Sequence, residues 1–262
     1  MTPASPAQPT EAVPEVQHTT CCIVGGGPAG VMLALLLARQ KIHVTLLESH
    51  LDFDRDFRGD TVHPATLEVL DQLGLADQLL QRPHGTMRNL SFHTPDGPIT
   101  LMQGNRIATK FPYVAMLPQV DFLNFVTEQA RRYPSFQLVM GATVQRLVIE
   151  NGTVRGVRYR DHDNQWHEVR ALLTIGADGR FSKVRQLADM KLFGTAPPMD
   201  VLWFRLPRAA SDPGDAAAGY LGKGRLAIML SRANEWQVGY VFPKGSYPKL
   251  KAAGIDSVRQ GL

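Results

Sequence analysis

A glycine-rich turn between an apolar strand and an apolar helix constrains this chain more than any other feature. The apolar run over residues 21–24 predicts a buried parallel strand, and it leads directly into Gly25-Gly26-Gly27-Pro28-Ala29-Gly30. A helical segment over 31–39 and a second strand over 44–47 follow, and the second strand stops at Glu48. Strand, G-x-G-x-x-G, helix, strand and acid, in this order, are typical of a dinucleotide-binding βαβ unit.

Each position of this fingerprint has a physical role. Gly25 permits the tight turn, Gly27 lets the backbone approach a pyrophosphate, and Gly30 lets helix and strand pack closely. The phosphates would lie at the helix N-terminus, where N–H groups without helical partners and the helix dipole favour negative charge. Glu48 would accept hydrogen bonds from ribose hydroxyls and would repel a 2′-phosphate. The alternative is a glycine-rich turn in an ordinary α/β protein.

Composition argues against several other classes of protein. The net charge of +4 is mild and the 262 residues contain no dense run of Lys and Arg, so a nucleic-acid partner has no support. Cys21 and Cys22 are neighbours in one strand, and their side chains would point to opposite faces, which predicts buried, reduced thiols. No apolar run reaches membrane-spanning length. Residues 1–17 lack signal-peptide features and predict a disordered tail, so we expect a cytoplasmic protein.

Periodicity and turn signals predict the other elements. We expect helices over 65–73, 76–81 and 120–132, and strands over 136–140, 143–150, 153–160, 166–173 and 172–175. Asn151-Gly152 and Pro95-Asp96-Gly97 predict hairpin turns. Further strands are expected over 201–206, 225–230 and 236–242, with a flexible connection over 207–219.

Two more motifs follow the fingerprint. One joins Arg58-Gly59 to His63-Pro64-Ala65-Thr66-Leu67, with Leu73-Gly74-Leu75 after it. The other is the segment from Gly176 to Arg185, which has the spacing D-G-x-x-S-x-x-R. With these motifs in this order, residues 18–262 resemble the N-terminal two-thirds of single-component FAD-dependent aromatic hydroxylases of the p-hydroxybenzoate hydroxylase type.

The resemblance implies a role for each matching position. The ADP part of FAD would be bound by Gly25, Gly27, Pro28, Ala29, Gly30 and Glu48. Arg58 would lie near the flavin pyrophosphate, Gln119 would touch the flavin ribose, and Asp178 would serve both FAD and NAD(P)H. Each has a plainer alternative: a solvated charge for Arg58, a helix cap for Gln119, and an ordinary turn at Asp178 with Ser182 as an N-cap.

The resemblance also implies an architecture. We expect an α/β fold with a Rossmann-like FAD-binding parallel sheet and a β-meander, interleaved with an antiparallel-sheet substrate domain. The FAD-binding domain would comprise residues 18–85 and 105–194, and the partial substrate domain 86–104 and 195–262. The meander over 143–173 would cover the parallel sheet, and the fingerprint would lie close to Asp178.

The implied activity is that of an FAD-dependent monooxygenase. In the family, NAD(P)H reduces FAD and O₂ supplies one oxygen atom to an aromatic ring, so we expect an aromatic or polyketide-like small-molecule substrate. The cofactor supplies the redox chemistry, and no nucleophile–base pair, metal-ligand spacing or catalytic residue is identified. The substrate would lie against the sheet that carries Trp203, Arg205, Met229 and Tyr240.

One family segment has no counterpart. The family carries a buried strand ending in Gly-Asp near the start of its last third; Gly59-Asp60 and Gly214-Asp215 lack that context. We therefore expect a chain that lacks the C-terminal third and binds FAD weakly or not at all. The alternatives are a flavin-dependent reductase or halogenase of the same fold, or a non-catalytic FAD-domain fragment. The segment from Trp236 to Pro243 lacks the paired tryptophans of halogenases. The sequence does not indicate an oligomeric state.

Overall fold

Two units that alternate along the chain make up the fold. The computed structural model describes residues 16–54, 60–194, 197–209, 211–212, 217–222, 225–232 and 235–254. Contacts group residues 1–54 with 123–192, called unit 1 here, and residues 55–122 with 193–262, called unit 2. The domain boundaries expected from the sequence follow a different division and stay a prediction.

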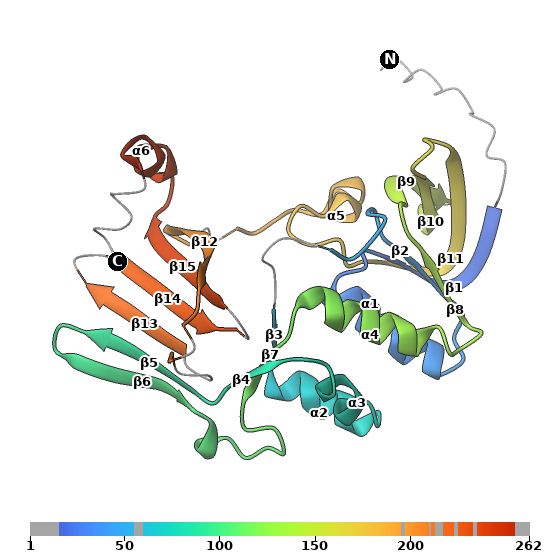
Figure 1. The fold of residues 1–262 in the computed structure, drawn as a ribbon. Helices are drawn as coiled ribbons and strands as arrows, with labels where there is room; N and C mark the ends of the chain where they lie inside the picture. The colour runs from blue at the N-terminus through green and yellow to red at the C-terminus, as the bar shows by residue number, and fades with distance from the viewer. Residues whose placement is uncertain are drawn as a thin grey trace. The chain divides into compact units, whose positions relative to one another are not determined.

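A six-stranded sheet forms the centre of unit 1, in the order β8-β2-β1-β11-β10-β9 (Figure 1). Four of its strands run parallel: β8 (Phe136–Val139), β2 (Val44–Leu47), β1 (Val16–Val24) and β11 (Trp166–Gly176). β1 begins at Val16, so part of the predicted tail is strand, while residues 1–15 lie outside the described residues. All of β2 and residues 21–24 of β1 are buried, as expected for strands covered on both faces.

The two cysteines lie in the buried half of β1. Both are free and buried, as the sequence predicts. Burial raises the pKa of the Cys22 thiol to about 12, and the neighbouring Cys21 adds to this. These thiols are therefore packing groups rather than reactive groups.

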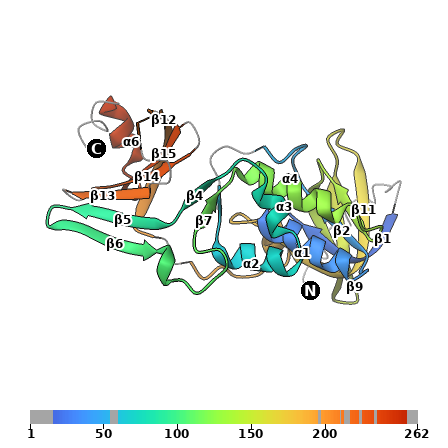
Figure 2. The same cartoon turned by 60° about the horizontal axis from the view of Figure 1, so that its bottom comes forward.

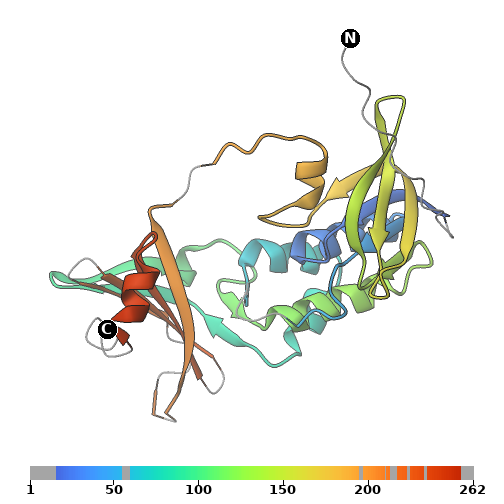
Figure 3. The ribbon, with the colours of Figure 1, turned by 90° about the horizontal axis from the view of Figure 1, so that it is seen from above.

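The meander consists of β9 (Thr143–Glu150), β10 (Thr153–Arg160) and β11. Asn151 and Gly152 both have positive φ, 50° and 74°, which confirms the predicted hairpin turn. Two expectations were wrong. The two strands predicted over 166–175 are the single strand β11, and the meander joins the parallel sheet through β11 instead of only covering it. Figure 3 shows these long strands in yellow and green.

Helices complete unit 1. α1 (Pro28–Arg39) contacts β1, β2 and β8, and its buried residues recur at helical spacing. α4 (Gln119–Ala130) begins in unit 2 and continues in unit 1, and its apolar residues from Phe122 to Ala130 are buried. α5 (Lys183–Leu187) contacts β9 and β11. The core beside α5 includes Cys22 and Leu47 from the parallel strands and Val157 and Val169 from the meander.

The first part of unit 2 is a small helical and β region. α2 (Pro64–Gln72) ends before Gly74, whose φ of 72° is typical of a glycine just after a helix, and α3 (Ala76–Leu80) follows. A three-stranded sheet in the order β3-β7-β4 comprises β3 (Thr61–Val62), β7 (Val114–Met116) and β4 (Gly85–Met87). Strands of two or three residues carry too little periodicity to be predicted.

A second six-stranded sheet forms the rest of unit 2, in the order β12-β15-β14-β13-β5-β6 (Figure 2). Its strands are β5 (Asn89–Thr94), β6 (Gly97–Gln103), β12 (Met199–Pro207), β13 (Ala217–Gly222), β14 (Arg225–Ser231) and β15 (Glu235–Pro243). The hairpin predicted over 89–102 is confirmed, and the 3₁₀ turn η1 (Gly104–Arg106) follows it. The prediction of a flexible connection over 207–219 was wrong at its C-terminal end, because β13 begins at Ala217 and pairs with β5 and β14.

One face of this sheet carries the short helix α6 (Tyr247–Ala252), the red helix of Figure 3. Tyr240 and Phe242 form a cluster there with Leu202, Phe204 and Leu250 of α6. The parallel sheet with its meander, interleaved along the chain with this mainly antiparallel sheet, confirms the predicted fold class.

Candidate functional site

The turn after β1 brings the first and third sequence motifs together. Gly25 has a φ of 108°, which favours glycine, and its N–H donates to the Leu47 carbonyl oxygen at 2.8 Å. A Cβ on Gly25 would lie 2.5 Å from the carbonyl oxygen of Ala177 and 2.7 Å from the backbone nitrogen of Asp178. The expected proximity of the fingerprint and Asp178 is therefore confirmed.

The start of α1 has the features that a bound phosphate needs. Gly27 is the N-cap with extended backbone, and Pro28 occupies the first turn, where a missing N–H costs no helical hydrogen bond. A Cβ on Gly27 would meet no atom of the described residues within 4 Å, so the missing side chain leaves space beside the backbone. The first turn also contains no acidic side chain. A pyrophosphate fits this helix N-terminus on both charge and space.

Close packing behind the turn explains the last glycine of the fingerprint. Gly30 is buried, and a Cβ there would overlap the carbonyl oxygen of Gly25. Ala29, in contrast, is exposed on the first turn of α1. The sequence therefore combines one glycine for the turn, one for open space and one for close contact.

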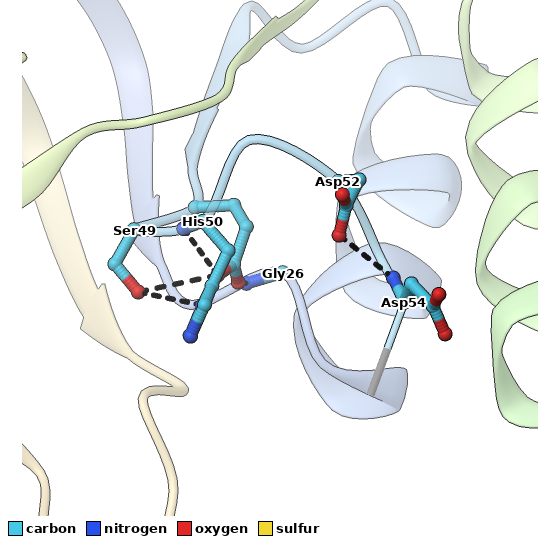
Figure 4. Close-up of polar contacts among 6 residues, drawn as sticks. Gly26, Ser49, His50, Asp52 and Asp54 are labelled. Carbon is cyan, nitrogen blue, oxygen red and sulfur yellow. Dashed lines mark hydrogen bonds and ion pairs between the residues drawn. The ribbon is translucent and has the colours of Figure 1, made fainter. Parts of the chain in front are cut away.

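The carboxylate of Glu48 ties the fingerprint to the loop after β2, and Figure 4 labels three residues that contact it, Gly26, Ser49 and His50. One oxygen accepts from the Gly26 N–H at 2.8 Å, and the other accepts from the His50 N–H at 2.9 Å and lies 2.7 Å from His50 Nδ1. The Ser49 hydroxyl donates to the same oxygen at 3.2 Å. Glu48 is only 7% exposed. A carboxylate has about four acceptor positions, and these four contacts already use that number, so a ribose hydroxyl would have to replace one of them. The sequence reasoning did not identify His50.

Asp178 holds the start of α5. One carboxylate oxygen accepts from the Ser182 hydroxyl at 2.5 Å, and the other accepts from the N–H groups of Lys183 at 2.6 Å and Val184 at 3.0 Å. Ser182 in turn accepts from the Arg185 N–H at 3.0 Å, which confirms the N-cap alternative for Ser182. Asp178 therefore has a structural role in shaping the turn that contacts Gly25.

The remaining predicted cofactor residues belong to unit 2 by sequence. Gln119 is the first residue of α4, and its N–H donates to Asp60 Oδ1 at 2.9 Å. Arg58 lies outside the described residues. Asp60 was considered in the sequence only as part of a Gly-Asp segment, and its contact with α4 could not be read from spacing.

The residues that the sequence analysis places beside the substrate lie on both faces of the second six-stranded sheet. Trp203 pairs with Gly239, whereas Leu202 pairs with Tyr240, so Trp203 and Tyr240 point in opposite directions. The ring of Trp203 covers Gly239, where a Cβ would lie 2.9 Å from it. Tyr240 is instead buried in the cluster beside α6. Strand register therefore separates the two side chains.

Two classes of site do not appear in the described part of the chain. No group of three or more His, Cys, Asp or Glu side chains there could hold a metal ion. Of the helices in the same residues, none combines the length and apolar character needed to cross a bilayer.

Comparison with known proteins places these motifs in a family. Residues 18–249 match the family model described as FAD binding domain. A 6-methylpretetramide 4-monooxygenase from Streptomyces rimosus is 34% identical over 252 residues, covering 94% of this chain and 58% of that protein. The chain thus spans little more than half of this relative's length.

Solved structures share the fold. A p-nitrophenol 4-monooxygenase from Pseudomonas putida superposes with a TM-score of 0.77 at 21% identity, covering 91% of this chain and 61% of the other. A myxobacterial chondrochloren halogenase gives a TM-score of 0.77 at 19% identity, covering 93% of this chain and 57% of the other. At these identities the likeness shows the fold alone. With its three motifs and the match over residues 18–249, this chain belongs to the FAD binding domain family.

Proposed function

We propose that this chain is the FAD-binding part of a monooxygenase that hydroxylates an aromatic or polyketide-like small molecule with NAD(P)H and O₂. The observation that carries the proposal is the open space beside Gly27, where a Cβ would meet no atom of the described residues within 4 Å, on a turn that contacts the D-G motif at Asp178. The relative from Streptomyces rimosus is named as a monooxygenase and aligns with 94% of this chain, which supports the same reaction class.

The proposal assigns the adenosine end of FAD to unit 1. The pyrophosphate would lie at the N-terminus of α1, contacted by backbone N–H groups beside Gly27, Pro28, Ala29 and Gly30. Glu48 would accept from the ribose hydroxyls while it continues to hold Gly26 and His50. Asp178 would act by shaping the turn against Gly25, and Arg58 and Gln119 would contact the pyrophosphate and the flavin ribose.

When bound, FAD supplies the redox chemistry, so the chain's own work is binding, orientation and exclusion of water. The helix dipole and the N–H groups of α1 offset the negative charge of the pyrophosphate. The buried Glu48 disfavours a phosphate on the adenosine ribose, because two negative charges would meet there. We propose a small aromatic substrate and a cytoplasmic location as parts of the same hypothesis.

A halogenase is the second candidate, because a halogenase shares the fold at a TM-score of 0.77. The segment from Trp236 to Pro243 counts against it, since it lacks paired tryptophans. A flavin-dependent reductase is the third. Product analysis distinguishes them: a monooxygenase incorporates one labelled oxygen atom from O₂, a halogenase adds a halide, and a reductase adds hydrogen.

Two experiments test the proposal at different levels. Titration of the 262-residue chain with FAD and with ADP, by flavin fluorescence and calorimetry, tests the nucleotide site. NAD(P)H oxidation and labelled-oxygen incorporation by the longest protein that contains this chain test the activity. Failure of the chain to bind either nucleotide, together with a product that contains no oxygen from O₂, would refute the proposed function.

A further inference from the structure

An ion pair in unit 2 joins residues that lie far apart in the sequence. Asp60 directly precedes β3 and Arg232 directly follows β14, and 172 positions separate them. Arg232 Nη2 donates to Asp60 Oδ2, and each side chain is only 12% exposed. Because both charges lose hydration, such a pair is weak evidence for a role in stability. Its other contacts indicate what it does instead.

Asp60 holds the beginning of α4 from outside the helix. Its second carboxylate oxygen accepts from the N–H of Gln119 at 2.9 Å, and its backbone carbonyl accepts from the Leu117 N–H at 3.1 Å. Pro118, which precedes the helix, offers no side-chain acceptor. A carboxylate at this place satisfies a helix N–H that has no partner within the helix and interacts favourably with the dipole. Asp60 therefore fixes where α4 starts.

Arg232 is held by the hairpin from which it comes. Its Nε and Nη2 donate to Gln237 Oε1 at 2.9 and 2.8 Å, and Gln237 is buried in β15. The Arg232 N–H donates to the Glu235 carbonyl oxygen at 2.9 Å, which connects the ends of β14 and β15. Arg208 Nη1 donates to the Arg232 carbonyl oxygen at 3.2 Å. The guanidinium group is therefore oriented by the sheet before it meets Asp60.

Other ion pairs in the described residues connect nearer neighbours or are exposed. Glu168 in β11 pairs with Arg158 in the adjacent strand, ten positions away. Lys110 and Asp71 pair at 2.5 Å with side chains 56% and 38% exposed, so water can replace either partner. The pair of Asp60 with Arg232 differs because both of its side chains are mostly shielded from water and because it joins a helix start to a distant hairpin.

We propose that Asp60 and Arg232 are positioning residues that fix the N-terminus of α4, and with it Gln119, to the β14–β15 hairpin. This inference rests on the proposed function, in which Gln119 contacts the flavin ribose and the antiparallel sheet carries the substrate. The ion pair holds the start of α4 in a fixed position relative to the β14–β15 hairpin.

Amide hydrogen exchange of the 262-residue chain tests the mechanical part without cofactor. We expect Arg232→Ala to accelerate exchange of the Gln119 amide by roughly tenfold or more, since its acceptor loses its fixed position. Arg232→Lys keeps the charge and should recover part of the protection. Lys110→Ala removes an ion pair of the same unit and should leave Gln119 unchanged. Asp60→Asn gives a second route to the same result if Arg232→Ala does not fold.

FAD titration tests the functional part. Arg232→Ala should bind FAD about tenfold more weakly than the parent, the Lys variant should recover part of the affinity, and Lys110→Ala should bind as the parent does. Asp60→Asn combined with Arg232→Ala should be no weaker than the single variants, because both changes remove one interaction. Unchanged Gln119 exchange in Arg232→Ala, or equal FAD affinity of Arg232→Ala and Lys110→Ala, overturns the proposal. A parent chain that binds neither FAD nor ADP counts against the proposed function, and the exchange measurement still decides whether the pair positions α4.

Discussion

The substitution Gly27→Ala separates cofactor binding from folding more cleanly than any other change in the fingerprint. Gly27 has φ −72° and ψ 178°, which alanine adopts without strain. The new Cβ would meet no atom of the described residues within 4 Å. Reduced freedom of the unfolded chain stabilises by about 0.4–1 kcal/mol, and the poorer N-cap costs about 0.5–1 kcal/mol. The two effects offset, so Tm should change by less than about 2 °C.

The same methyl group would occupy the space that a pyrophosphate needs. If it removes one hydrogen bond to a charged phosphate, binding weakens by about 1.5–3 kcal/mol. That corresponds to about a 10- to 150-fold higher dissociation constant. ADP is the sharper probe, because it carries only the part of FAD that this turn would hold. Calorimetric titration with ADP, beside thermal unfolding of the same samples, gives both quantities.

Two other glycines provide matched controls. Gly25→Ala should lose stability, because a φ of 108° strains alanine and the Cβ would lie 2.5 Å from Ala177 oxygen; strain and overpacking together cost about 2–5 kcal/mol. Gly152→Ala, at a φ of 74° in the β9–β10 turn, should lose about 1 kcal/mol and keep its ADP affinity. The reasoning is refuted if Gly27→Ala binds ADP as the parent does, or if it loses stability as Gly25→Ala does.

Three further predictions concern carboxylates in or next to the six-stranded sheet of unit 1. Glu48→Ala should weaken FAD binding by about 1–3 kcal/mol, measured by fluorescence titration, and equal affinity would remove Glu48 from the site. Asp178→Ala should expose the N–H groups of Lys183 and Val184 to exchange, and unchanged protection would contradict its capping role. Burial would raise the pKa of Glu168, but hydrogen bonds from Arg158 and Arg170 hold that pKa below its usual 4.5. The Glu168 contribution to stability is therefore complete above pH 4.5 and is lost as the pH falls through the lower folded pKa. Urea unfolding of Glu168→Gln should show a weaker acid dependence than the parent, and identical pH profiles would contradict this.

Local signals predicted the parts of the fold that depend on neighbouring residues. Asn151-Gly152 needs positive φ at both positions, and the turn appears where the sequence indicates it. Two glycines of the fingerprint are likewise local signals, because the φ of 108° at Gly25 and the contact of Gly30 with the Gly25 carbonyl oxygen both lie within the turn. The helix start at Pro28 and the stop near Gly74 follow from the same kind of local rule.

The errors arise where pairing between distant segments decides the structure. β13 was read as a connection because Ala217 and Gly219 have low strand propensity, yet the ring of Phe92 in β5 covers Gly219 and the strand is paired on both sides. The sequence predicts two strands over 166–173 and 172–175, whereas β11 is one strand that pairs with β10 at its start and with β1 along most of its length. Sequence periodicity indicates which side chains share one face of a strand. It does not indicate where along the strand the neighbouring, hydrogen-bonded strand changes.

In the candidate site, the motifs can be recognised in the sequence, but their proximity depends on the fold. Gly25 and Ala177 come from segments about 150 positions apart, and parallel pairing of β1 with β11 brings both motifs to the carboxyl ends of neighbouring strands. In the folded chain, the Asp178 carboxylate accepts from an N–H group at the start of α5, and the Glu48 carboxylate accepts from the N–H groups of Gly26 and His50. Both acids therefore first hold the glycine-rich turn and its neighbour in shape. A ligand would find the N–H groups of α1 already aimed outward, which reduces the ordering that binding requires.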